Sequence, residues 1–223
     1  MTGCKPVLQQ NMDEFHERHL PHFQPLGGLF FVTFNLYGCI PKEIYQQWEH
    51  EFQVEKEKIM LFSKSKNEDL ERLNKIAFAK KDKFLDTYSG GKHFLKSETL
   101  AKIVADALHF WDGKRFELFA YCIMSNHVHV VLRLFNDTEI STPPYLQEIM
   151  HSIKRFSARE CNKLLGETGK FWQDESYDRL IRNDEELHKI LVYVLNNPVK
   201  AGLCQQMKDW KWSYIKDVYN HIM

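Results

Sequence analysis

The sequence predicts an α+β fold in which an antiparallel sheet carries helices on one face. Segments rich in β-branched and aromatic residues, such as residues 29–37, alternate with segments whose apolar residues recur at helical spacing. The resulting order is strand, helices, strand, strand, helix, strand, helix, and a short mixed order of this kind suits an antiparallel sheet. With 223 residues, 43% apolar and 13% aromatic, the chain can form one large domain with a buried core.

A single domain is predicted over residues 29–215, after an N-terminal extension (1–28) that ends in a turn-rich loop and before a short C-terminal tail (216–223). The strand at 29–37 alternates only weakly, so we expect it in the middle of the sheet with both faces buried. The charged stretch at 42–86 is interpreted as an inserted, solvated pair of helices, in preference to a binding surface. After a helix at 97–110, we expect a strand at 116–124 that leads into the strand of His127 and His129, within the run 121–133.

The later elements are a helix from Pro143 to Leu165, an extended segment at 171–182, and a helix that begins at Asn183 or Asp184. This last helix is expected to run to Asn196, because Asn197-Pro198 ends it.

Composition narrows the class of protein. The 30 basic and 30 acidic residues cancel, which argues against nonspecific coating of nucleic acid but permits a local basic groove. The five cysteines are scattered without a CxxC pair, as expected for reduced thiols. No apolar run reaches the ~20 residues of a membrane span and no signal peptide is evident, so we expect a cytoplasmic protein that does not bind membranes.

The pair His127 and His129 is the most informative feature of the sequence. It lies in a run with apolar, β-branched flanks, Tyr121–Arg133, that is typical of a strand. Residues i and i+2 of a strand point to the same face and lie roughly 7 Å apart along the backbone. Two imidazoles on one face can converge on a divalent metal ion, although such pairs are also often structural.

Tyr193 and Asn197 form a second pair, one helical turn apart in the run Leu187–Gly202. A helix lying across the sheet would bring Tyr193 beside the two histidines, and Asn197 could supply a third, oxygen ligand. Two imidazoles and an amide leave Mg²⁺ or Mn²⁺ with open positions for phosphate oxygens. A phenol, whose pKa is about 10, attacks a phosphodiester usefully only if a metal polarises the phosphate. The alternative for Tyr193 alone is a core tyrosine with a satisfied hydroxyl.

These motifs resemble those of the single-tyrosine HUH transposases, and most closely the REP-associated tyrosine transposases. The resemblance covers residues 18 to 215. It is carried by the following runs: Arg18–His22 with Phe30–Phe34, Asn126–His129, Ile153–Arg159, Phe171–Arg179, Tyr193–Gly202 and Trp210–Tyr214. The sequence departs from the family pattern in three places. Asn197 stands where insertion-sequence relatives often carry glutamine, Ser125 stands where proline is common before Asn126-His127, and the stretch at 42–86 is foreign to the minimal family core.

The resemblance implies a ferredoxin-like (RRM-like) core with the two histidines on a central strand. It implies a transposase-like enzyme that cleaves and joins single-stranded DNA at the foot of hairpins. Tyr193 would attack a phosphodiester and form a 5′-phosphotyrosine link, while His127, His129 and Asn197 would hold Mg²⁺ or Mn²⁺. Single-stranded DNA with hairpins would be the partner, bound by a monomer or a homodimer.

The candidate DNA-binding residues are basic and aromatic. Lys154, Arg155 and Arg159 share a broad helix face that could hold phosphates, and Lys200 follows the tyrosine motif. Trp172 and Tyr177 could stack on unpaired bases. A solvated helix face and core packing are the respective alternatives.

Two other functions stay open. A hairpin-binding regulatory protein with little turnover would keep the fold without the chemistry. A metal-dependent hydrolase that uses water would keep its activity after Tyr193→Phe, whereas a tyrosine transposase would lose it.

Overall fold

The computed structural model describes residues 15–18, 20–23, 25, 27–135 and 145–223. Its centre is a five-stranded sheet in the order β6-β3-β5-β4-β7, in which every neighbouring pair is antiparallel. The strands are β3 (Leu29–Asn35), β4 (Phe116–Ile123), β5 (His127–Leu134), β6 (Tyr177–Ile181) and β7 (Ser213–Ile215). The predicted α+β class is therefore confirmed, and the strand that carries the two histidines lies in the middle of the sheet.

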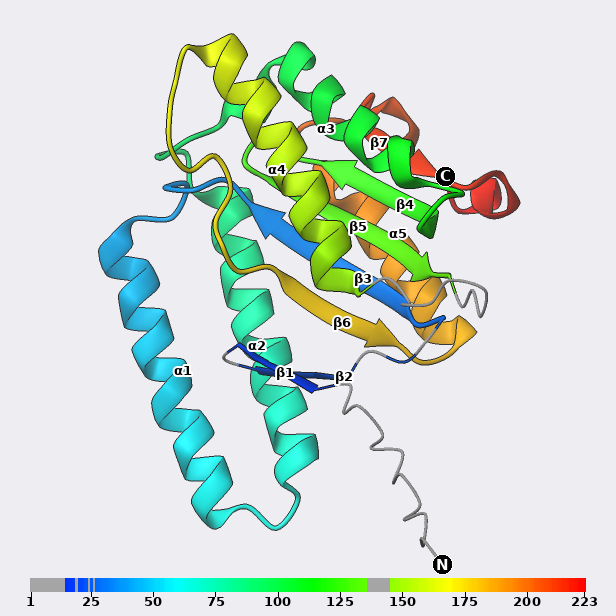
Figure 1. The fold of residues 1–223 in the computed structure, drawn as a ribbon. Helices are drawn as coiled ribbons and strands as arrows, with labels where there is room; N and C mark the ends of the chain where they lie inside the picture. The colour runs from blue at the N-terminus through cyan, green and yellow to red at the C-terminus, as the bar shows by residue number, and fades with distance from the viewer. Residues whose placement is uncertain (1–14, 19, 24, 26, 136–144) are drawn as a thin grey trace, which may run out of the picture.

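Helices cover both faces of this sheet rather than one (Figure 1). On one face, α3 (Glu98–Trp111) and α4 (Leu146–Leu165) pack over Phe30, Val130 and Leu132. On the other face, α5 (Asp184–Lys200) packs over Phe31 and Val131. The reason is that β3 is buried on both sides along its whole length, so both of its apolar faces need a cover.

An extra residue in β4 sets which side chains reach each face. The pairing of β4 with β5 shifts register between Leu118 and Ala120, at a β-bulge. As a result Leu118 belongs to the cluster under α3 and α4, whereas Phe119 and Ala120 both belong to the cluster under α5.

A long helical hairpin projects from the sheet (Figure 1). It consists of α1 (Lys42–Phe62) and α2 (Lys66–Thr87), in agreement with the helix pair predicted at 42–86. No residue of α1 is buried, and the two helices are joined by polar contacts such as the ion pair between Lys80 and Glu51, at 2.6 Å. Most of the hairpin is thus solvated, as expected, but the end of α2 is not.

Two predicted features differ from the structure, while the predicted helix start at Pro143 lies outside the residues that the structure describes. The turn-rich N-terminal segment contains a small hairpin, β1 (Phe15–Arg18) and β2 (Leu20–Phe23), which pair only with each other. Helix α5 does not end at Asn196, as predicted, but continues through Pro198 to Lys200. Proline in the last turn removes one N–H, while the Asn197 carbonyl still accepts from the Ala201 N–H at 3.0 Å, so the helix tolerates it.

The remaining elements are short. In the described part of the chain, three 3₁₀ turns lie at Phe94–Lys96, Met207–Asp209 and Asp217–Ile222. The predicted start of α5 is correct, because the Asn183 side chain accepts from the Glu186 N–H.

The four cysteines in the described part of the chain are free thiols. None of the described helices combines the length and apolarity that a bilayer crossing requires.

Candidate metal and nucleophile site

His127 and His129 lie on β5 and face the same side of the sheet as α5. Their Nε2 atoms are 3.1 Å apart, and the side chains are 1% and 0% exposed. The predicted i, i+2 arrangement therefore brings both imidazoles to one point, deep under α2 and α5.

The outer nitrogen of each ring is held by a neighbouring side chain. The Asn126 Oδ1 atom lies 2.7 Å from His127 Nδ1, and the Asn126 Nδ2 group donates to the Leu85 carbonyl of α2 at 3.0 Å. Because this Oδ1 can only accept, Nδ1 of His127 carries the proton and Nε2 has a free lone pair. Thr33 Oγ1 contacts His129 Nδ1 at 2.7 Å and can serve either tautomer of that ring. Burial, followed by the neighbouring His129, lowers the pKa of His127 well below its usual value, so this imidazole is neutral.

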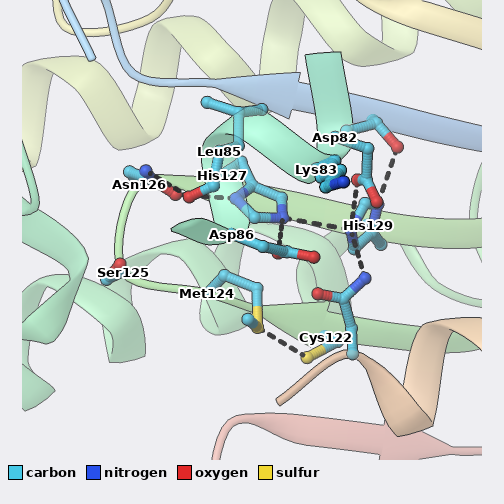
Figure 2. Close-up of polar contacts among 12 residues, drawn as sticks. Asp82, Lys83, Leu85, Asp86, Cys122, Met124, Ser125, Asn126, His127 and His129 are labelled. Carbon is cyan, nitrogen blue, oxygen red and sulfur yellow. Dashed lines mark hydrogen bonds and ion pairs between the residues drawn. The ribbon is translucent and has the colours of Figure 1, made fainter. Parts of the chain in front are cut away.

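Helix α2 brings two carboxylates to the histidines (Figure 2). Asp82 Oδ1 lies 3.3 Å from His129 Nε2, and Asp86 Oδ1 lies 3.8 Å from His127 Nε2. Both Oδ1 atoms are buried without a hydrogen-bond partner. The balanced charges of this stretch predict a solvated helix, yet Asp82 is a buried member of the site.

The two carboxylates differ in their acidity. Burial favours the neutral form of Asp82, but its contacts with His129, His127 and Tyr193 outweigh burial and lower its pKa to about 2. Burial, followed by the negative charge of Asp82, raises the pKa of Asp86 to about 6. Near neutral pH the site thus holds two negative charges beside a neutral imidazole.

Tyr193 reaches the cluster from α5. Its hydroxyl donates to Asp82 Oδ2, and its ring packs edge-on against His129 and Phe31, with centroids 5.6 and 5.8 Å away. Burial, followed by the charge of Asp82, raises the pKa of Tyr193, so the phenol is protonated at neutral pH. The ring is half-buried, and the ammonium of the exposed Lys200 lies over it, 4.8 Å from the centroid.

Asn197 lies one turn after Tyr193 and is fully buried. Its Nδ2 group is 3.1 Å from His129 Nε2, while its Oδ1 has no hydrogen-bond partner. An amide can turn over to exchange these two atoms, so Asn197 can also present its oxygen to the histidines.

The donor atoms fit a divalent cation. One ligand atom from each of Asp82, His127 and His129 lies within 4.8 Å of the others. A free imidazole lone pair faces another ring nitrogen, and two buried carboxylate oxygens lack partners beside it. Such a set of inward-facing lone pairs is costly by itself and favourable around a cation.

The structure separates the predicted DNA-binding residues. The Lys154 ammonium is used inside the protein, because it donates to the Gln173 and Asp174 carbonyls and to Ser176 Oγ, at 2.7, 2.9 and 3.2 Å. Trp172 is 4% exposed and donates its indole N–H to Ser157 Oγ at 2.9 Å, so in this conformation its ring offers no face to a base.

The remaining four candidates are more accessible. Arg155 and Arg159 are exposed on α4, which covers the face of the sheet opposite the histidines. Arg159 pairs with the adjacent Glu160 at 2.7 Å. Tyr177 is half-buried on the same face as the histidines and stacks on Phe78 of α2 with centroids 4.2 Å apart. Only Lys200 of the predicted DNA-binding residues lies directly at the tyrosine.

Comparison with known proteins agrees with the motifs. Residues 92–197 match the family model described as "Transposase IS200 like", and this match includes both histidines, Tyr193 and Asn197 but begins after α2. A Haemophilus influenzae protein whose name places it with the REP-associated tyrosine transposases is 30% identical over 106 residues, which is 44% of this chain and 58% of that protein. The REP-associated tyrosine transposase of Escherichia coli K12 is 26% identical over 99 residues, covering 44% of this chain and 53% of the relative. The matches thus span between 53% and 58% of the length of these relatives.

A solved structure shows the same fold. It is described as a REP-associated tyrosine transposase bound to a REP hairpin, and it superposes with a TM-score of 0.54 at 18% identity, covering 95% of this chain and 88% of that chain. The resemblance predicted from the sequence is therefore confirmed by family, relatives and fold.

Proposed function

Since its sequence and fold resemble those of the REP-associated tyrosine transposases, we propose that this chain is a metal-dependent single-stranded DNA endonuclease and strand transferase that acts at hairpins. The observation that carries the proposal is the meeting of Tyr193 with His127 and His129 in one buried cluster. Residues 29–215 would form the catalytic domain, acting in the cytoplasm as a monomer or homodimer.

Tyr193 would be the nucleophile. Its Oη attacks the phosphorus, the bond from phosphorus to the 3′-oxygen breaks, and the products are a 5′-phosphotyrosine link and a free 3′-hydroxyl. The phenol must lose its proton, and Asp82 Oδ2 already accepts a hydrogen bond from it. The reverse attack by a 3′-hydroxyl would release Tyr193 and join strands.

His127 and His129 would hold Mg²⁺ or Mn²⁺, with Asn197 beside them as the third ligand that the resemblance implies. When bound, such an ion polarises the phosphate and offsets the charge that develops on it. A phosphate would approach Tyr193 from the side of Lys200, whose ammonium can contact its oxygens.

The other proposed DNA contacts are less direct. Arg155 and Arg159 would hold phosphates on the far side of the sheet from the histidines. Tyr177 would contact an unpaired base at the edge formed by β6. Lys154 and Trp172 would act by shaping the segment that leads into β6, which the Lys154 ammonium already holds.

The proposal is tested with labelled single-stranded hairpins from the DNA that flanks the gene, in Mg²⁺ or Mn²⁺. We expect a protein–DNA adduct that survives denaturation in wild type and vanishes in Tyr193→Phe. Tyr219→Phe is the matched control, because Tyr219 packs on Phe119, away from the histidines. Cleavage that persists in Tyr193→Phe without an adduct would favour a hydrolase, and hairpin binding without products would favour a regulatory protein.

A further inference from the structure

Asp82 is an unusual residue for a solvated hairpin. In the part of the chain that the structure describes, α1 has no buried residue, and α2 buries only Asp82 and Leu85. A buried carboxylate is unfavourable unless a cation or strong hydrogen bonds compensate it. No lysine or arginine among the described residues forms an ion pair with Asp82, whose Oδ1 lies 3.3 Å from His129 Nε2.

We propose that Asp82 completes the metal site and holds Tyr193 against it, so that the α1–α2 hairpin is a catalytic element of this chain. The inference rests on the proposed function and replaces Asn197, the third ligand that the resemblance implies, with Asp82. The hairpin lies outside the region matched by the family model, which starts at residue 92.

Asp82 is the better third ligand for chemical reasons. Its Oδ1 is charged, buried and without a hydrogen-bond partner, 3.3 Å from His129 Nε2. Asn197 presents its amide nitrogen to that same Nε2 at 3.1 Å and offers only a neutral oxygen after turning over. Hard divalent cations such as Mg²⁺ and Mn²⁺ prefer carboxylate oxygen, which also supplies charge that two imidazoles lack.

The second oxygen of Asp82 positions the nucleophile. Tyr193 donates its hydroxyl to Oδ2 of the carboxylate whose Oδ1 faces the histidines. One side chain would therefore fix both the metal and the attacking oxygen. Phe78, one turn earlier on α2, packs edge-on against the Tyr193 ring with centroids 6.2 Å apart and supports the same placement.

A hydrogen bond connects this part of α2 to the residue that precedes the histidine strand. The Leu85 carbonyl of α2 accepts from Asn126, whose Oδ1 in turn orients His127. The hairpin thus contributes to the site through a ligand candidate and through the residue that sets a histidine tautomer.

Calorimetric titration of the DNA-free protein with Mn²⁺ at a fixed pH tests the inference. We expect Asp82→Asn to weaken Mn²⁺ binding by about 10-fold or more. Asp82→Glu should restore part of the affinity because it returns the charge. The matched control is Glu68→Gln, which removes an exposed carboxylate near the start of the same helix and should bind as wild type does.

Asn197→Ala separates the two candidate third ligands and is expected to keep Mn²⁺ affinity within a few-fold of wild type. Wild-type affinity in Asp82→Asn, or loss of binding in Asn197→Ala alone, would overturn the inference. If Asp82→Asn does not fold by circular dichroism, Asp82→Ser is titrated instead under the same criteria.

The titration is independent of catalysis. An adduct at Tyr193 together with normal Mn²⁺ binding by Asp82→Asn would reject this inference and keep the proposed function. Weakened Mn²⁺ binding by Asp82→Asn in a protein that forms no adduct would keep the metal site and reject the proposed function.

Discussion

The two faces of β5 are both buried, but they differ in chemistry. On one face Val128, Val130 and Leu132 pack into an apolar core under α3 and α4. On the other face His127 and His129 meet polar groups from α2 and α5. The first face stabilises the fold, and the second stores unsatisfied polar atoms that favour a bound cation. One face of β5 therefore contributes mainly to the stability of the fold, and the other face carries the candidate metal ligands.

We expect the largest effect from His129→Ala, which tests whether the histidine face of β5 is needed for activity. The substitution removes the nitrogen nearest to Asp82 and Asn197, so we expect cleavage and adduct formation to fall by about two orders of magnitude or more. Chelation of divalent metal should have a similar effect on wild type. Gel assays with labelled hairpin DNA would measure both, and full activity in His129→Ala would contradict the assignment of this face.

Val130→Ala tests the opposite face of the same strand. Val130 is fully buried, so its truncation should lower the free energy of unfolding by about 1–3 kcal/mol. Mn²⁺ affinity of the folded protein should stay unchanged, because the side chain points away from the histidines. Denaturant unfolding would measure the free energy of unfolding, and calorimetry would measure Mn²⁺ affinity. A large loss of Mn²⁺ binding without loss of stability would contradict the assignment of stability to this face and of metal binding to the other.

Asp86→Asn should stabilise the metal-free protein. The folded pKa of Asp86 is raised from 3.8 to about 6, so its contribution to stability is present below pH ~4 and is lost as pH rises through 6. With a chelator present, the variant should therefore gain about 1–3 kcal/mol over wild type at pH 7.5 and less at pH 5. Denaturant unfolding at the two pH values would measure this, and a variant less stable than wild type at pH 7.5 would contradict the cost assigned to this charge.

Arg155→Ala and Arg159→Ala should give the smallest effects. Both residues lie across the sheet from the histidines, so each substitution should weaken hairpin binding only a few-fold and reduce its salt dependence by about one phosphate contact. Lys102→Ala on α3 is the control, since Lys102 is an exposed lysine of the neighbouring helix and is not one of the predicted DNA-binding residues. Fluorescence anisotropy at several salt concentrations would measure how the affinity for the hairpin depends on salt. If this dependence is the same in both variants as in wild type, neither arginine contacts DNA phosphates.

The sequence predicted the parts of the site that depend on local spacing. The i, i+2 rule placed His127 and His129 on one face of a strand, and the i, i+4 rule placed Tyr193 and Asn197 on one side of a helix. These rules hold because they depend only on backbone geometry within one element.

Asp82 escaped prediction because its environment depends on how the hairpin docks on the sheet. Balanced charge made the whole stretch look solvated, and most of it is. A signal was present, since Asp82 lies four residues after Phe78 and three before Leu85, within the stripe that faces the core. An acidic residue inside an apolar stripe indicates a buried charge that needs a partner.

The side of the sheet taken by each helix was also beyond local patterns. Arg155 and Arg159 share a basic helix face, but the chain connection places α4 opposite the histidines. A tryptophan such as Trp172 can stack on bases, and the sequence does not reveal that tertiary packing buries it against Ser157.

The most direct test is peptide mapping of the covalent intermediate. Wild-type protein would be reacted with a labelled DNA hairpin in Mn²⁺, digested with nuclease and protease, and analysed by mass spectrometry. We expect a phosphonucleotide on the peptide that contains Tyr193. Cleavage of the DNA without a modified peptide, or modification of a different tyrosine, would contradict it.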